Sequence, residues 1–284
     1  MRSQALRGIA LMLAAVSTFS CLDAIAKYLA ALYAVPTIVW ARYVSQMLLM
    51  VLFLGPRMGR ELVRTANLRL QVIRGIVLTA SSLFFLSALA RMPLAEAASI
   101  AFMAPLFIAV LSGPLLHERV EARTWLALAV GFGGVLLIVR PGGELFTSAA
   151  LLPLASALMM AIYQLMTRRL AAHDAALTTL FYPALVGSAA VPLAFPVSMT
   201  LPGDALHLAM FCALGVLGGL GHFLLIRAHF HAPPSVLGPF MYGQLLTALA
   251  LGWLVFGQLP DGPALAGMLL ISASGLALAI SHRR

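Results

Sequence analysis

Long apolar stretches alternate with short polar or proline-containing segments from one end of the chain to the other. A transmembrane helix needs about 20 predominantly apolar residues to cross the roughly 30 Å hydrocarbon core of a bilayer. With glycine, proline and charge taken as breaks, that length predicts ten helices. They cover residues 6–32, 36–54, 70–90, 93–116, 123–140, 148–169, 175–197, 205–230, 234–257 and 263–281. Prolines in these helices predict kinks, at Pro105, Pro153, Pro183 and Pro239.

The composition excludes a water-soluble fold. Of the 284 residues, 62% are hydrophobic and only 10% are charged, and the mean hydropathy is +1.00, whereas soluble domains carry about 25% charged residues. The net charge of +9 does not indicate nucleic-acid binding, because the arginines punctuate apolar runs and form no basic face. We therefore expect an all-α polytopic protein in a lipid bilayer, with a first helix that is retained and not cleaved as a signal peptide.

Basic residues gather at one set of predicted helix ends. By the positive-inside rule, that set faces the cytoplasm. The rule predicts a multi-pass protein of a bacterial-type inner (plasma) membrane, with both termini in the cytoplasm. Cytoplasmic ends would then carry Arg2, Arg7, Arg57, Arg60, Arg64, Arg69, Arg74, Arg119, Arg123, Arg168, Arg169, Arg227, Arg283 and Arg284, and outer ends only Lys27, Arg91 and Arg140.

The chain is internally duplicated. A shift of 140 positions aligns the two halves from the second predicted helix onward, and it superposes prolines and glycines at helix breaks, where they mark backbone geometry. Superposed pairs include Pro56 with Pro196, Gly75 with Gly215, Pro93 with Pro233, and Phe102 with Tyr242. Residues 1–142 and 143–284 would each hold five helices. Because five is odd, the second copy enters the membrane from the opposite side, which is the inverted repeat of many secondary transporters.

The segment "ALARMPLAEAASIAFMAPLFIAVLSGPLLHERV", followed by "GFGGVLLIVRPG", resembles the fourth and fifth helices of the drug/metabolite transporter superfamily, in its EamA branch. Its counterpart in the second half, "IRAHFHAPPSVLGPFMYGQLLTALALGWLVFGQLPDG", is similar to the same pattern. The segments "DAIAKYL", "WARY" and "IRG" look most like the S-adenosylmethionine-uptake and riboflavin-uptake subgroups. The resemblance implies ten helices, cytoplasmic termini and a central cavity lined by both halves.

The stretch "FSCLDAIAKYLA" places Asp23 and Lys27 one helical turn apart inside the first helix. A charged side chain at the centre of such a helix costs about 2.5–3.5 kcal/mol on insertion scales and is a functional candidate by default. Aspartate four residues before lysine is the favourable order for an ion pair. The pair is therefore a candidate for substrate binding. In the structural alternative, Lys27 reaches the outer interface and Asp23 merely pairs with it.

Arg42, in "VWARYVSQ", lies seven residues into the second predicted helix, with Asp23 as a candidate partner. A guanidinium binds a carboxylate or phosphate through paired hydrogen bonds. The alternative is a structural bridge between Asp23 and Arg42, since a buried ion pair is not by itself evidence of function.

An aromatic ring beside an amide occurs in each of two helices of the second half. An aromatic and an amide together suit a planar or zwitterionic ligand, while the alternative role is hydrogen bonding between helices. The pairs are Tyr163 with Gln164, and Tyr242 with Gln244. The small hydroxyl of Ser82 is a further candidate for the cavity lining, or an ordinary packing residue.

His222 lies in a glycine-rich part of the eighth helix. It is a candidate proton relay, because histidine titrates near neutral pH, or a structural residue. No set of Cys, His and carboxylate residues has metal-ligand spacing, and no phosphate-binding motif occurs, so we expect no metal, no cofactor and no ATP hydrolysis. No nucleophile–base pair points to an enzyme.

The sequence predicts a secondary active transporter that moves a small polar organic metabolite by alternating access. An amino acid, an S-adenosylmethionine-like solute or a flavin-like solute would suit the mixture of acid, base, aromatic and amide. Protons or a counter-substrate are the candidate coupling partners, and a monomer or a homodimer the candidate assemblies. The alternative from another class is a non-transporting membrane sensor or assembly factor.

Overall fold

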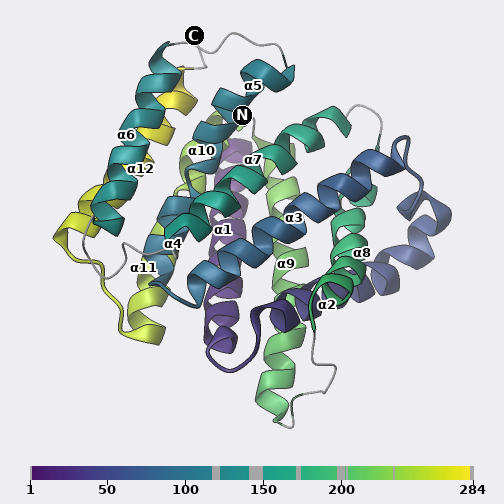
Figure 1. Ribbon diagram of the computed structural model, residues 1–284. Coiled ribbons are helices and arrows are strands. Elements are labelled where there is room, and N and C mark those ends of the chain that lie inside the picture. Colours follow the sequence, from purple (N-terminus) through teal and green to yellow (C-terminus); the bar gives the residue numbers. More distant parts are fainter. Residues whose placement is uncertain are drawn as a thin grey trace.

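A computed structural model describes residues 2–116, 122–140, 150–170, 174–196, 202, 204–232 and 234–281. Throughout these residues the regular secondary structure is helical (Figure 1). The helices are α1 (Arg2–Ala30), α2 (Val35–Met58), the 3₁₀ turn η1 (Gly59–Leu62), α3 (Leu68–Leu89), α4 (Leu94–Ala101), α5 (Ala104–Leu116), α6 (Ala122–Val139), α7 (Leu151–Leu170), α8 (Ala176–Ala194), α9 (Ala205–His231), α10 (Pro234–Met241), α11 (Gly243–Phe256) and α12 (Gly262–Ser281).

The ten predicted spans are confirmed in number and place, with boundaries that agree to within about four residues. Within the described residues, eight helical segments are long and apolar enough to cross a membrane, and two shorter apolar helices lie at Gly243–Phe256 and Gly262–Leu278. The fourth and ninth predicted spans, however, are each broken into two helices, namely α4 with α5 and α10 with α11.

The two breaks lie at equivalent places in the two halves. The first falls at residues 102–103, between α4 and α5, and the second at Tyr242, between α10 and α11. Pro105 accounts for the first, because it has no N–H to donate to the carbonyl of Ala101, and it fits the first turn of a new helix. The helices at the other predicted kinks are not broken in this way. Pro153 lies in the first turn of α7, and α8 runs on through Pro183. The Pro239 side chain lies outside the described part.

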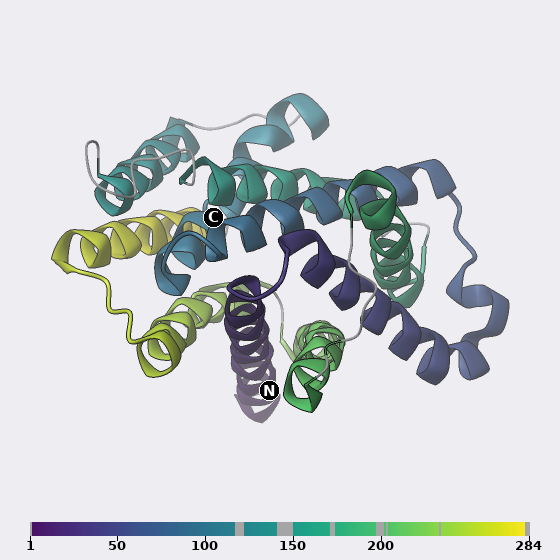
Figure 2. The ribbon, with the colours of Figure 1, turned by 60° about the horizontal axis from the view of Figure 1, so that its bottom comes forward.

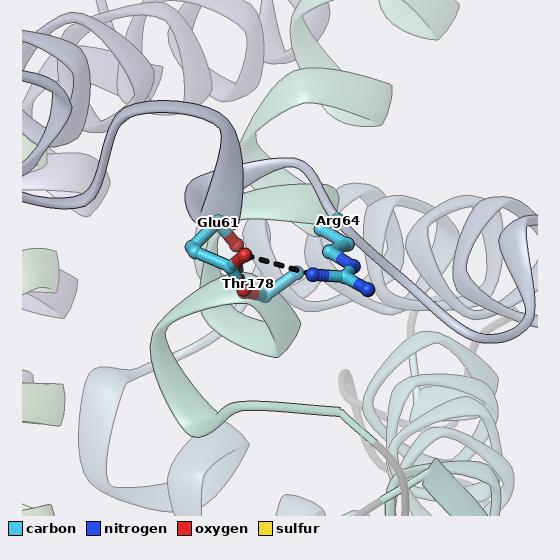
Figure 3. A network of polar contacts seen from close by, with 3 residues as sticks. All are labelled: Glu61, Arg64 and Thr178. Carbon is cyan, nitrogen blue, oxygen red and sulfur yellow. Dashed lines mark hydrogen bonds and ion pairs between the residues drawn. The ribbon is translucent and has the colours of Figure 1, made fainter.

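Helices α2 and α8, which are equivalents of each other in the duplication, run antiparallel. Near the start of α2, Trp40 Nε1 donates to the Ser188 carbonyl in the second part of α8, at 3.1 Å. Beyond the end of α2, the Glu61 carbonyl accepts from Thr178 Oγ1 at the start of α8, at 2.9 Å. Figure 3 shows Thr178 beside Glu61 and its ion-pair partner Arg64. Antiparallel equivalents mean that the two halves are inverted relative to each other, as predicted.

The packing between the two halves follows the same symmetry. Helix α1 of the first half packs on α9 of the second, and α7, the equivalent of α1, packs on α3, the equivalent of α9. The pair α6 with α12 lies on one flank and the pair α2 with α8 on the other (Figures 1 and 2). At the α6–α12 crossing, Gly134 and Gly267 face each other so closely that a side chain on either would meet the other's carbonyl.

The distribution of polar and apolar side chains is that of a membrane protein. Large apolar side chains are exposed along the outer faces, among them Leu52, Phe53, Trp253, Leu254 and Leu269. Charged and polar side chains, among them Asp23, Arg74 and Glu96, are instead buried between helices. Lipid tails would cover the former and could not solvate the latter.

Candidate substrate site

A small cavity lies where α1, α2, α3 and α9 meet, so that helices of both halves enclose it. Its volume is about 20 Å³, which is room for about one water molecule. We call it the first cavity; its walls are Leu22, Asp23, Ala26, Ile38, Val39, Arg42, Ser82, Phe85, Leu86, Leu89 and Leu214. The structure therefore brings together three of the predicted site residues, Asp23, Arg42 and Ser82, each from a different helix.

Asp23 is buried, and its Oδ2 accepts a hydrogen bond from Gln244 Nε2 on α11, at 3.4 Å. Contacts of Ser20 one turn earlier fix this approach of α1 to α11: its hydroxyl lies 2.7 Å from the Thr247 hydroxyl and 3.2 Å from the Gln244 carbonyl. Gln244, a predicted site residue, thus supports the carboxylate from behind the cavity. A predicted ion pair of Asp23 with Lys27 or Arg42 is not present among the described residues.

Lys27 is directed away from Asp23, which corrects the predicted pair. Its Nζ donates to the carbonyls of Leu89 and Met92, both at 2.7 Å, and lies 5.5 Å from the centre of the Phe256 ring. Leu89 is the last residue of α3, where helix geometry leaves carbonyls without partners, and Met92 lies in the turn that follows. The amine therefore caps α3 and ties it to α1.

Arg42 borders the first cavity with an incompletely paired guanidinium. Its Nε is buried and has no hydrogen-bond partner, and its Cζ lies 6.0 Å from the centre of the Tyr43 ring. The Tyr43 hydroxyl lies 2.8 Å from the Ser82 hydroxyl, which fixes the wall between α2 and α3. Gly218 of α9 leaves room beside Arg42, since a Cβ there would approach Nε to 3.9 Å. A buried donor without a partner is costly, and an arriving acceptor would remove that cost.

A second, larger cavity lies among α3, α7, α8 and α9, and it is more open to the surroundings than the first. Its volume is about 260 Å³. We call it the second cavity; its walls are Arg74, Tyr163, Thr167, Asp174, Ala176, Thr179, Leu180 and Ile226.

The two cavities occupy equivalent positions in the inverted halves. Applying the shift of 140 to three of the first cavity's eleven wall residues leads to wall residues of the second. The equivalent pairs are Val39 with Thr179, Leu86 with Ile226, and Leu214 with Arg74. Asp23 and Tyr163 also come from equivalent helices, α1 and α7, but they precede the aligned region, where Gln164 is roughly the equivalent of Asp23. The chain thus contains two cavities at equivalent places, which differ in their wall residues and in their volume.

Sequence reasoning missed the importance of Arg74, which it counted as a charge at a cytoplasmic helix end. The structure buries Arg74 completely on α3. Its Nη1 donates to Thr167 Oγ1 at 3.0 Å, and its Nη2 donates to Gln71 Oε1 at 2.9 Å and to the Thr179 carbonyl. Its guanidinium lies 4.9 Å from the centre of the Tyr163 ring. The available signal was its depth, because Arg74 falls five residues inside the predicted span 70–90.

The remaining predicted residues are dispersed. Gln164 is exposed and lines neither cavity, so it does not join Tyr163 in one site. Tyr242 stands at the helix break and contacts Phe102, with ring centres 5.1 Å apart. His222 packs edge-on against Phe19 of α1, also at 5.1 Å.

The family comparison gives this geometry its context. The model of the EamA-like transporter family matches the chain twice, over residues 6–140 and 147–280. The chain belongs to the EamA-like transporter family. Membership makes it a membrane transporter and not an enzyme, and confirms the resemblance to the drug/metabolite transporter superfamily.

Curated relatives of this EamA-like chain are named as transporters of different solutes. A riboflavin transporter of Vibrio cholerae is 29% identical over 273 residues, which are 95% of this chain and 91% of the relative. An S-adenosylmethionine uptake transporter of Rickettsia conorii is 24% identical over 279 residues, covering 98% and 94%. A pseudopaline exporter of Pseudomonas aeruginosa is 28% identical over 276 residues, covering 95% of each. Both uptake and export thus occur among the relatives' names.

A solved crystal structure shares the fold of this EamA-like transporter. It matches with a TM-score of 0.62 at 20% sequence identity, and the match covers 100% of this chain and 99% of the other. The arrangement of helices is therefore one that occurs in an experimentally determined protein.

Proposed function

We propose that this transporter is a secondary carrier that moves a small polar organic metabolite by alternating access. The observation that carries the proposal is the pair of equivalent cavities in two inverted halves, of which the first, at about 20 Å³, is much smaller than the second, at about 260 Å³. Inverted halves can exchange conformations, so that the smaller cavity opens while its equivalent closes. The carrier would then expose its site to the two sides of the membrane in turn.

The first cavity is the proposed substrate site. Asp23 supplies a carboxylate for a cationic group, Arg42 supplies a guanidinium with a free N–H for an acceptor, and Ser82 adds a hydroxyl. Gln244 holds the carboxylate in place. Charges buried at this depth would be costly without a function or a partner. The site would take an amino acid, an S-adenosylmethionine-like solute or a flavin-like solute, and the relatives' names support the last two.

The proposed orientation places both termini in the cytoplasm, in a bacterial-type inner membrane, with residues 1–142 and 143–284 as the two repeats. The link between α2 and α3 meets the link between α7 and α8, because Asp174 accepts hydrogen bonds from Thr65 Oγ1 at 2.5 Å and from the Ala66 N–H at 2.8 Å. Arg64 and Arg168 lie in or next to these links, which supports a cytoplasmic position. The second cavity would then belong to the cytoplasmic half.

A flux assay in proteoliposomes tests the proposal. Riboflavin, S-adenosylmethionine and a set of amino acids would be supplied with and without a proton gradient, which also separates proton coupling from exchange. We expect uptake of at least one solute, and its loss in Asp23→Asn and in Arg42→Gln. The matched controls are Asp204→Asn, which keeps the N-terminal cap of α9, and Arg64→Gln, which removes an exposed ion pair.

Transport lost equally in the controls would contradict the assignment of the site. Folded protein that moves none of the solutes would instead support the sensor or assembly-factor alternative. A flux that survives both cavity substitutions would place the substrate elsewhere in the chain.

A further inference from the structure

We propose that the second cavity is itself a binding site for a small organic anion, with Arg74 as the residue that receives a carboxylate or phosphate group. The inference rests on the proposed function only for the role that such binding would have in transport. Binding to this cavity is measured on purified protein without any flux, so the two ideas can fail separately.

The charge of Arg74 is the first step of the argument. The side chain is fully buried in a helix that crosses the membrane, where an isolated cation is costly. Its hydrogen bonds go to a hydroxyl, an amide and a carbonyl, and among the described residues no carboxylate forms an ion pair with it. The charge of Asp174 acts on Arg74 from nearby, but the direct hydrogen-bond partners of the guanidinium are neutral, which leaves it able to bind an anion.

Asp174 does not fill that role directly. Gln71 stands between the two charges: its Oε1 accepts from Arg74, and its Nε2 donates to Asp174 Oδ2 at 2.7 Å. The carboxylate is further held by the link before α3, through Thr65 and Ala66. Asp174 therefore orients Gln71 and the α2–α3 link, and it forms part of the cavity wall.

The Arg74 guanidinium is also held in a fixed orientation, and one of its N–H groups has no hydrogen-bond partner. The Tyr163 ring lies 4.9 Å from its Cζ and holds it against α7. Its Nε is buried and has no hydrogen-bond partner. Beside it, Thr167 and Thr179 line about 260 Å³ of space. An oriented guanidinium with a donor to spare and two nearby hydroxyls suits a planar carboxylate or a phosphate.

The equivalent position in the first cavity shows that this feature is specific to the second. Leu214 stands there in place of Arg74. The duplication therefore preserved the pocket and changed its charge.

Calorimetry on the purified full chain in neutral detergent tests the inference with benzoate and phenyl phosphate as anions, and with benzamide as their uncharged match. We expect the anions to bind at least about tenfold more tightly than benzamide. Arg74→Lys should weaken the anions at least about tenfold, because lysine lacks the planar fork, whereas Arg64→Lys at the exposed pair should leave them unchanged. Equal binding of benzoate and benzamide, or binding of neither, would overturn the inference.

Two further measurements keep the inference falsifiable if Arg74→Lys does not fold. Thr167→Val removes one hydroxyl of the cavity and should weaken benzoate but not benzamide. In a Cys21→Ser background, Ala176→Cys should be protected by benzoate from a thiol reagent, while the exposed native Cys212 reacts at an unchanged rate. Protection of both thiols or of neither would count against this location.

The anionic group could come from a solute or from a lipid headgroup. Addition of phosphatidylglycerol, with phosphatidylcholine as the control, distinguishes the sources. Displacement of benzoate by phosphatidylglycerol alone assigns the site to lipid phosphate, and no displacement assigns it to a soluble anion. Both outcomes support the anion site, and equal displacement by both lipids contradicts it.

Discussion

The rings of Phe102 and Tyr242 lie in contact, with centres 5.1 Å apart and planes inclined at 36°. The two residues are 140 positions apart, and each occupies the break in its own half's divided helix. A residue that contacts its own equivalent lies on the axis that relates the two halves. The broken helices therefore meet at the centre of the molecule, where the two halves would have to move against each other.

This contact should be measurable as a coupling free energy. In a double-mutant cycle with Phe102→Leu and Tyr242→Leu, we expect a coupling of about 0.5–1.5 kcal/mol in the free energy of unfolding, because aromatic pairs contribute that much beyond buried area. Reversible unfolding in detergent micelles measures it. A coupling indistinguishable from zero would mean that the rings are only near each other.

Gly215 should tolerate no side chain, whereas Gly219 on the same helix should. A Cβ at Gly215 would meet Ser45 and the Gln46 backbone on α2, at 2.7 Å from the Gln46 nitrogen, but nothing lies within 4 Å of one at Gly219. We expect Gly215→Ala to destabilise by about 1–3 kcal/mol through overpacking. Gly219→Ala should be neutral or stabilising by up to about 1 kcal/mol, since alanine favours helix. Thermal unfolding in micelles compares the two, and equal effects would contradict the close contact of α9 with α2.

Asp261 should make a contribution to the stability of the folded protein that depends on pH in the acid range. The Ala264 N–H, which donates to Asp261 at 3.1 Å, and the Arg140 guanidinium hold the pKa of this carboxyl below its ordinary value of 3.8. A lowered folded pKa adds stability above pH 3.8 that is lost as the pH falls through the folded pKa. The difference in Tm between wild type and Asp261→Asn should be constant near neutral pH and shrink below pH 3.8. A difference that grows on acidification would contradict this sign.

Lys27 should prove to be structural. Lys27→Met leaves the Leu89 and Met92 carbonyls without their donor, which should cost about 1–3 kcal/mol of stability. Lys27→Arg, which keeps donors, should retain most of that stability. The affinity for the transported solute, measured by calorimetry, should change little in either variant. Normal stability combined with lost affinity in Lys27→Met would restore the role in substrate binding that the sequence predicted.

The helices and their inversion were predictable because both depend on local or periodic features. Span length follows from the bilayer thickness, and the inversion follows from an odd number of spans in each copy. The coincidence of Gly75 with Gly215 also has a physical basis, since each glycine lets the third helix of one half pack on the second helix of the other, at Val186 and at Ser45. Such contacts constrain the same position in both copies.

The site was predictable only in part, because its contacts link distant parts of the chain. Asp23 and Gln244 are 221 positions apart, and no local sequence pattern predicts their hydrogen bond. Helical spacing predicts a pair of Lys27 with Asp23, yet Lys27 donates to the carbonyls of Leu89 and Met92, at and just after the end of α3. The positive-inside rule places Arg74 at a helix end, because it counts basic residues near a span and takes little account of how deep each one lies.

The central claim is that the two equivalent cavities open in turn, and thiol labelling at one equivalent pair tests it most directly. Val39→Cys lines the first cavity and Thr179→Cys, its equivalent, lines the second. Each would be placed in a background without Cys21 and Cys212 and labelled with a small polar thiol reagent, with and without the solute that gives the highest flux. The account predicts that the solute raises the labelling rate at one position and lowers it at the other. Rates that rise or fall together, or that do not respond, would contradict it.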